Sequence, residues 1–164
     1  MKTILVPTDF NVESIKIIDS LVVTNKPEEI TIVFIHAFKL SDSITDMLML
    51  SRRSRDYENV SDDFYTQLNL YKQKYPNHIK SIGIDYFYGS SVAAFKNFIE
   101  AKNADLIAYP KDHNFTAINK YSIDPATLTK RCGCDVLEID INEFSKEEKL
   151  FETKIYENNS TISA

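Results

Sequence analysis

Few side chains in this sequence have the type and spacing that chemistry would require. Asp9 follows an apolar run and a proline in Leu5-Val6-Pro7-Thr8-Asp9, where its carboxylate can bind a ligand hydroxyl or cap the next helix. Both roles place the carboxylate at the same helix N-terminus, so the sequence leaves them open. We expect no catalysis by Asp9 alone, because general acid–base chemistry needs a second carboxylate or a base nearby.

The histidines and cysteines carry weaker signals. His36 lies in an apolar run and is interpreted as a hydrogen-bonded core residue, whereas His113 is interpreted as a solvated loop residue. A structural zinc site needs four ligands, but Cys132 and Cys134 have no second cysteine pair or spaced histidine pair to join. We interpret both as reduced thiols that frame the last strand. The sequence therefore predicts no metal site, no catalytic residue and no enzyme.

Composition and charge exclude several classes of function. The chain has 164 residues, 43% hydrophobic and 26% charged, which suits one domain with one core. Its net charge of −5 opposes binding to nucleic acid or anionic lipid. No segment approaches the about 20 apolar residues of a membrane span, and no signal-peptide core follows the N-terminus. We expect a cytoplasmic protein that binds neither nucleic acid nor membranes.

Alternating strand and helix patterns must position these residues. Apolar, β-branched runs predict strands at 4–6, 30–38, 79–88, 106–109 and 135–141, with Pro7 ending the first. Helical spacing of apolar residues predicts helices at 12–23, 44–50, 60–75, 92–99 and 125–130. This alternation indicates an open, Rossmann-like, five-stranded parallel sheet with helices on both faces. The predicted domain spans 1–142, and 143–164 form a polar tail.

The carboxyl edge of this sheet is the expected ligand site. Ligands of open parallel sheets bind beyond the carboxyl ends of the strands, where the strand order reverses. That edge would carry 8–9, 37–38, 89–90 and the loop that starts at 110. Residues 111–122 are predicted to form a polar, irregular loop with Phe115, Ile118 and Tyr121 as apolar anchors.

Several segments together resemble the universal stress protein family. They are Leu5–Phe10, Glu28–Ala37, Gly89 before a helix, Ala104–Ile107 and Cys134–Leu137, and the resemblance covers residues 2–141. It implies an adenine-nucleotide alpha-hydrolase-like sheet with strand order 3-2-1-4-5, whose central strand comes first. It also implies a stress-responsive cytoplasmic protein, a homodimer paired through the last strand, and ATP binding in some members.

By this resemblance, one side of a nucleotide site is present. Pro7 and Asp9 would line the adenosine side, and Ala37 would make the backbone contact to adenine. Nucleotide-binding members carry glycines after the fourth strand in the pattern G-x2-G-x9-G-[S/T]. Glycine leaves the backbone N–H groups open to the phosphate oxygens and permits positive φ angles.

The phosphate side of that site is not retained. Counted from the fourth strand, the glycine pattern falls on Pro110, His113, Ile123 and Asp124; counted back from the fifth, its last pair is Ser122 and Ile123. Neither alignment contains a glycine. Proline has no N–H to donate, and an aspartate facing the phosphates would repel them.

These patterns predict a non-enzymatic, universal-stress-protein-like module for stress response or sensing. We expect a homodimer with no cofactor that does not bind ATP in the usual way. The alternative is a protein that binds ATP, another adenine nucleotide or a different small ligand beside Asp9 and Ala37. A pocket filled by Phe115 or Tyr121 would count against that alternative.

Overall fold

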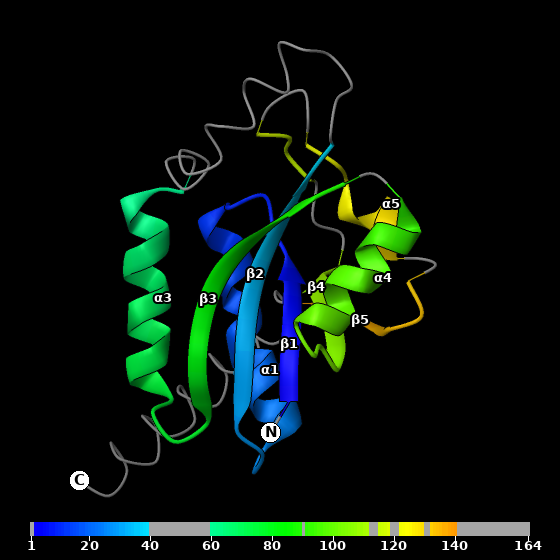
Figure 1. Cartoon of the computed structure of the whole chain (residues 1–164). Helices are drawn as coiled ribbons and strands as arrows, with labels where there is room; N and C mark the ends of the chain where they lie inside the picture. The colour runs from blue at the N-terminus through cyan, green and yellow to red at the C-terminus, as the bar shows by residue number, and fades with distance from the viewer. Residues whose placement is uncertain are drawn as a thin grey trace, which may run out of the picture.

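Five parallel strands form one sheet in the part of the chain that the structure describes. The computed structural model describes residues 2–39, 60–89, 91–111, 115–118, 122–129 and 132–140. The strands are β1 (Lys2–Pro7), β2 (Ile30–Phe38), β3 (Ile79–Tyr88), β4 (Leu106–Pro110) and β5 (Asp135–Ile139), in the order β3-β2-β1-β4-β5 (Figure 1). The predicted fold class and strand order are therefore confirmed.

Helices cover both faces of this sheet. They are α1 (Ile17–Asn25), α3 (Asp62–Lys74), α4 (Val92–Ala101) and α5 (Pro125–Thr129), with a 3-10 turn, η1 (Val12–Lys16), before α1. In Figure 1, α1 lies behind the strands and α4 in front of them. The helix expected over 12–23 thus begins as a 3-10 turn and extends two residues further, whereas the helix predicted at 44–50 lies outside the described residues.

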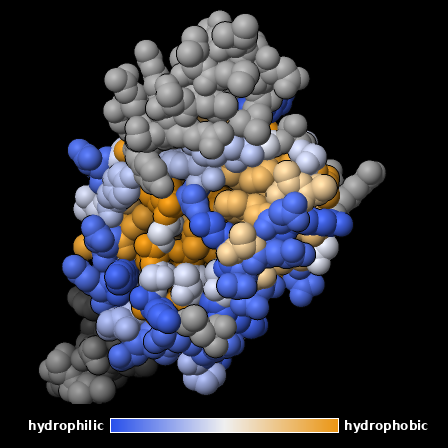
Figure 2. Space-filling model, viewed as in Figure 1, coloured by the Kyte–Doolittle hydropathy of each residue, from blue (hydrophilic) through white to orange (hydrophobic). Residues whose placement is uncertain are grey.

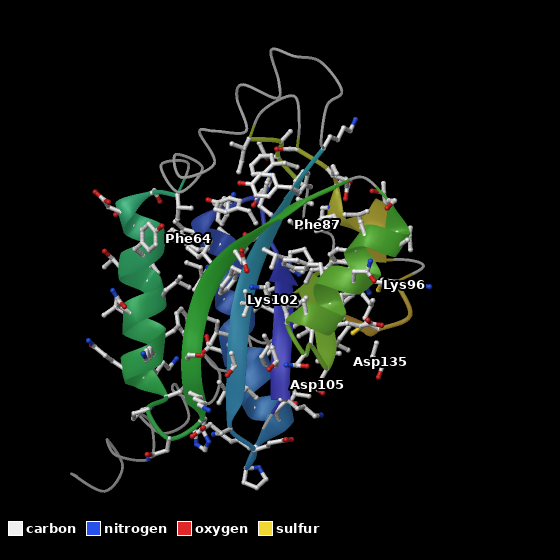
Figure 3. The ribbon with its side chains drawn as sticks, viewed as in Figure 1. Phe64, Phe87, Lys96, Lys102, Asp105 and Asp135 are labelled. Carbon is white, nitrogen blue, oxygen red and sulfur yellow. The ribbon has the colours of Figure 1, made fainter. Side chains whose placement is uncertain are left out.

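Alternation along each strand produces two cores. Ile4 and Val6 of β1 belong to the cluster that packs on α1 and α3, whereas Leu5 between them belongs to the cluster around α4 and α5. Phe64 and Phe87 mark the two sides: Phe64 packs in the first cluster and Phe87 in the second (Figure 3). β1 has partners on both edges and is buried from Ile4 onward, as expected for a central parallel strand.

Side-chain caps begin the helices where the sequence contains short polar residues. The Asn11 side chain accepts from the Glu13 N–H at η1, and Ser61 and Ser91 accept from N–H groups in the first turns of α3 and α4. Asp124 accepts from the Ala126 N–H at 3.0 Å ahead of α5. Each such cap is worth about 1 kcal/mol.

A buried carboxylate joins α1 to α3. Asp19 is 6% exposed and accepts hydrogen bonds from Tyr71 at 3.1 Å, from Lys74 at 2.9 Å, and from Tyr75. Burial of the phenol, followed by the hydrogen bond to Asp19, raises the pKa of Tyr75 to about 12, and burial raises the pKa of Tyr71 further. The phenols are therefore neutral donors at physiological pH.

Hydrophobic side chains also reach the surface. Figure 2 shows them gathered around the middle of one face, over the sheet and α4, within a polar surround. In the described portion, no helix has the length and apolar character that crossing a membrane would take.

Candidate functional site

The turn after β1 is organised by its own polar groups. The Thr8 hydroxyl accepts from the Phe10 N–H at 3.0 Å and lies 2.9 Å from the Ser14 hydroxyl, which donates to the Asn11 carbonyl at 2.7 Å. Phe10 has a φ of 62°, which is rare for a large side chain and is tolerated only where surrounding contacts enforce it. The sequence contained no signal for this conformation.

Asp9 connects the turn to a distant loop. Its Oδ1 accepts from the Asn11 N–H at 3.1 Å, and its Oδ2 accepts from the Thr116 N–H at 3.0 Å. The side chain is 9% exposed, and both of its carboxylate oxygens have the hydrogen-bond partners that a buried polar group needs. Asp9 orders the turn ahead of η1, but the side-chain cap of that turn is Asn11, and the ligand-binding role of Asp9 stays a prediction.

His36 is a hydrogen-bonded core histidine, as the sequence indicated. Its ring is 1% exposed, with Nδ1 2.7 Å from the Thr8 carbonyl oxygen and Nε2 2.8 Å from the Ser122 hydroxyl. Because a carbonyl oxygen can only accept, Nδ1 carries a proton. In the neutral ring, Nε2 therefore accepts a hydrogen bond from the Ser122 hydroxyl.

Aromatic rings enclose this imidazole. Phe115 stacks on it at 5.5 Å between centroids with an interplanar angle of 19°, and Phe10 stacks at 5.5 Å with an angle of 28°. Phe38 lies 4.7 Å away in a tilted arrangement. The ring thus exchanges water for apolar contacts, and its two nitrogens keep polar partners.

Residues 115–118 and 122–123, here called the strap, cross the carboxyl edge of β1 and β2. The strap donates the Thr116 N–H to Asp9 and the Ile123 N–H to the Ala37 carbonyl oxygen at 2.9 Å. Phe38 and Ser122 also form an isolated antiparallel bridge. The strap therefore contacts Asp9, His36 and Ala37, the residues that surround the expected ligand site.

Among the described residues, a small cavity lies beneath the strap. A cavity of about 10 Å³ is lined by Pro7, Thr8, Ile35, His36, Ala37, Phe95, Phe115, Ile123, Pro125 and Leu128. A buried water needs about 10–15 Å³ on this measure. Of the three predicted cofactor-binding residues, the cavity brings Pro7 and Ala37 together, whereas Asp9 lies beside it and is joined to the strap.

The residues expected on the phosphate side make contacts within the fold. Pro110 is buried at the end of β4, and the Ile123 N–H is bonded to Ala37 rather than directed at an open cradle. The exposed Asp124 caps α5. His113 and Tyr121 lie outside the described residues.

The outer edge of the sheet contrasts with this closed region. Asp135, Val136, Leu137 and Glu138 of β5 are all exposed, Val136 by 38% and Leu137 by 36%. Glu138 accepts a hydrogen bond from the Tyr109 hydroxyl at 2.9 Å, and burial together with this bond raises the pKa of Tyr109. Two apolar side chains on successive strand positions point to opposite faces of the sheet.

The two cysteines lie near the amino ends of β4 and β5. The buried Cys132 thiol donates to the Thr129 carbonyl at 3.1 Å, and Cys134 is half-buried, with a pKa raised chiefly by that burial. They border an open hollow of about 530 Å³, beside which Lys96, Asp105 and Asp135 lie (Figure 3). Among the described residues, no three histidine, cysteine or acidic side chains gather closely enough to hold a metal ion.

Comparison with known proteins defines the fold but adds no sequence relative. No protein-family model matches the chain, and no curated protein matches it either. The crystal structure of the hypothetical protein PH0823 is similar at a TM-score of 0.53 and 17% identity, over 85% of this chain and 95% of that one. The structure of the hypothetical protein MJ0577 is similar at 0.51 and 14%, over 85% and 95%.

A universal stress protein is among the similar structures. UspA from Lactobacillus plantarum matches at a TM-score of 0.49 and 13% identity, over 84% of this chain and 97% of that one. At such identities the likeness is one of fold. The sheet order β3-β2-β1-β4-β5 and the likeness to these two structures confirm the expected fold, and membership of the universal stress protein family stays a prediction.

Proposed function

We propose that this protein is a universal-stress-protein-like, non-enzymatic module for stress response or sensing, which does not bind ATP in the usual way. One observation carries the proposal: the strap occupies the carboxyl edge where a ligand of this fold would bind. Thr116 bonds to Asp9, Ser122 to His36, and Ile123 to the Ala37 carbonyl. A nucleotide would have to replace all three contacts.

The energetics of that replacement oppose binding. The strap belongs to the same chain, so its contacts carry no cost in translational or rotational freedom, whereas an incoming ligand loses both. The cavity that the described residues enclose there, about 10 Å³, is far below the 300–1,000 Å³ or so typical of ligand pockets. The missing glycines and the acidic side chain of Asp124 remove the phosphate contacts that could offset this cost.

Calorimetric titration with Mg²⁺–ATP tests this proposal. We expect no binding at low micromolar affinity for the wild-type chain. Phe115→Ala, which removes the ring stacked on His36, supplies a matched variant: the missing cradle predicts that it too fails to bind tightly. Low-micromolar binding by the wild type would contradict the proposal and favour the small-ligand alternative beside Asp9 and Ala37.

We further propose that the chain forms a homodimer through β5. The exposed Val136 and Leu137 and the outer backbone edge of this strand support the proposal, because edge strands with apolar side chains readily pair with a second strand. Light scattering should give twice the chain mass of 18.9 kDa. A monomeric mass at micromolar concentration would reject it.

A further inference from the structure

Ser122 and His36 form a hydroxyl–imidazole pair with a defined direction of proton donation. The Ser122 Oγ lies 2.8 Å from Nε2, and the Thr8 carbonyl, 2.7 Å from Nδ1, holds the tautomer in which Nε2 accepts. We propose that Ser122 is a nucleophile, with His36 as its base, and that small activated esters acylate it. The step is stoichiometric, with one acyl group for each chain.

Both partners are held in position. The imidazole is 1% exposed and stacked against Phe10 and Phe115, so it cannot turn away from Ser122. The Ile118 N–H donates to the Ser122 Oγ at 3.0 Å, which orients the hydroxyl further. A serine within hydrogen-bond reach of a base that a third group orients is the arrangement that activates nucleophiles, and the Thr8 carbonyl is that third group.

The surroundings define the class of acyl group. Ser122 is half-buried, and the next residue, Ile123, lines the cavity of about 10 Å³ together with His36. Ala37, Phe95 and Leu128 make this cavity apolar. At about 10 Å³ this cavity holds no more than a water-sized group, so an acyl group on Ser122 must be small and lie on the side from which the half-buried hydroxyl is reached.

The reaction balances without an added reagent. The Ser122 Oγ attacks the carbonyl carbon of the ester, and the bond from that carbon to the leaving oxygen breaks. The hydroxyl proton passes to Nε2 of His36 and then to the leaving oxygen. The products are an ester at Ser122 and a free alcohol or phenol, and no atom changes oxidation state.

Acetylation by p-nitrophenyl acetate tests the proposal on the full chain. We expect release of one equivalent of p-nitrophenolate and a gain of one acetyl group on the proteolytic peptide that contains Ser122. Ser81 supplies the internal reference, because its hydroxyl lies 3.5 Å from that of Thr31 and is paired with no imidazole. General-base assistance predicts that Ser122 reacts about 100-fold faster than Ser81.

Matched variants and an unfolded control decide the outcome. Ser122→Ala should abolish the rapid equivalent, and Ser81→Ala should leave it unchanged. In urea the wild-type Ser122 should react no faster than Ser81, because the imidazole is no longer held beside it. Equal rates at Ser122 and Ser81 in the folded chain, or a rapid equivalent that persists in Ser122→Ala, would overturn the proposal. Calorimetric titration with ATP tests the proposed function independently of this acylation assay.

Discussion

The carboxyl edge of β1 and β2 differs from the outer edge of β5 in what covers its side chains and backbone groups. At the carboxyl edge, Asp9, His36 and the Ala37 carbonyl all receive partners from the strap. At β5, Val136 and Leu137 remain exposed on opposite faces. Among the described residues, the polar groups of the first region have partners within the chain, whereas the second leaves apolar side chains exposed to solvent.

This difference has a physical basis. A buried polar group without a partner costs about 1–3 kcal/mol, so a chain that lacks a ligand must supply those partners itself. An apolar side chain at a surface costs far less in a single chain and contributes when a partner removes it from water. Substitutions at the carboxyl edge therefore test contacts within the chain, and substitutions at β5 test the proposed contacts between chains.

The largest effect is expected from His36→Ala. The substitution removes a buried ring, two hydrogen bonds and three aromatic contacts, and should lower the free energy of unfolding by about 3 kcal/mol. Urea unfolding monitored by circular dichroism measures it. His78→Ala is the matched control: His78 is half-buried and its Nδ1 has no hydrogen-bond partner among the described residues, so its loss should cost under about 1 kcal/mol. Equal losses of unfolding free energy in the two variants would show that the contacts of His36 at the carboxyl edge contribute no more than those of His78.

Leu137→Asp should act on association alone. A carboxylate placed in the proposed β5 interface should weaken the dimer by about 100-fold, because a buried unpaired charge is costly. The fold should change little, since Leu137 is exposed in the single chain. Sedimentation across a concentration series measures the shift. Val23→Asp, at a residue of α1 that is 50% exposed, is the control and should leave the dimer intact.

Asp9→Asn should weaken the strap by a smaller amount. An amide can keep one oxygen for the Asn11 N–H but directs an NH₂ group at the Thr116 N–H, so we expect a loss of about 1–2 kcal/mol. Amide exchange at Thr116 should also accelerate. Asp124→Asn provides the contrast, because asparagine caps helices as well as aspartate does. A neutral Asp9→Asn would indicate that the strap does not depend on this carboxylate.

Alkaline pH acts outside both edges, on the contact between α1 and α3. The pKa of Tyr75 is raised from 10.0 to about 12, so its folded form holds the proton more tightly than the unfolded chain. The stabilisation is complete below pH 10 and is lost as pH rises from 10 toward 12. Urea midpoints across that range measure it. Tyr75→Phe should make the dependence shallower, with Tyr71 supplying the rest, and an unchanged slope would contradict the assignment.

Much of the fold could be predicted from residue patterns. β2 and β3 have the predicted bounds, and the helices predicted at 92–99 and 125–130 correspond to α4 and α5. Local rules suffice there, because strand period and helix capping depend on neighbours in the sequence. Phe115 was also anticipated as an anchor of its loop. Its position against His36 was not.

The contacts that decide the site join residues far apart in the chain. Ser122 is 86 positions from His36, and Thr116 is 107 positions from Asp9, so no periodicity or motif could pair them. The positive φ of Phe10 was equally invisible, since it is a strained conformation that only the surrounding packing maintains.

The sequence by itself determined the parallel sheet and, through the family resemblance, predicted a central first strand and a phosphate side without glycines. These depend on residue type and on spacing over a few positions. Only the tertiary structure decided that the strap closes the carboxyl edge, that the Asp9 carboxylate tethers it, and that the Ser122 hydroxyl donates to His36. A chain folds such distant groups together because buried polar atoms must find partners, and many loop sequences can supply an N–H or a hydroxyl.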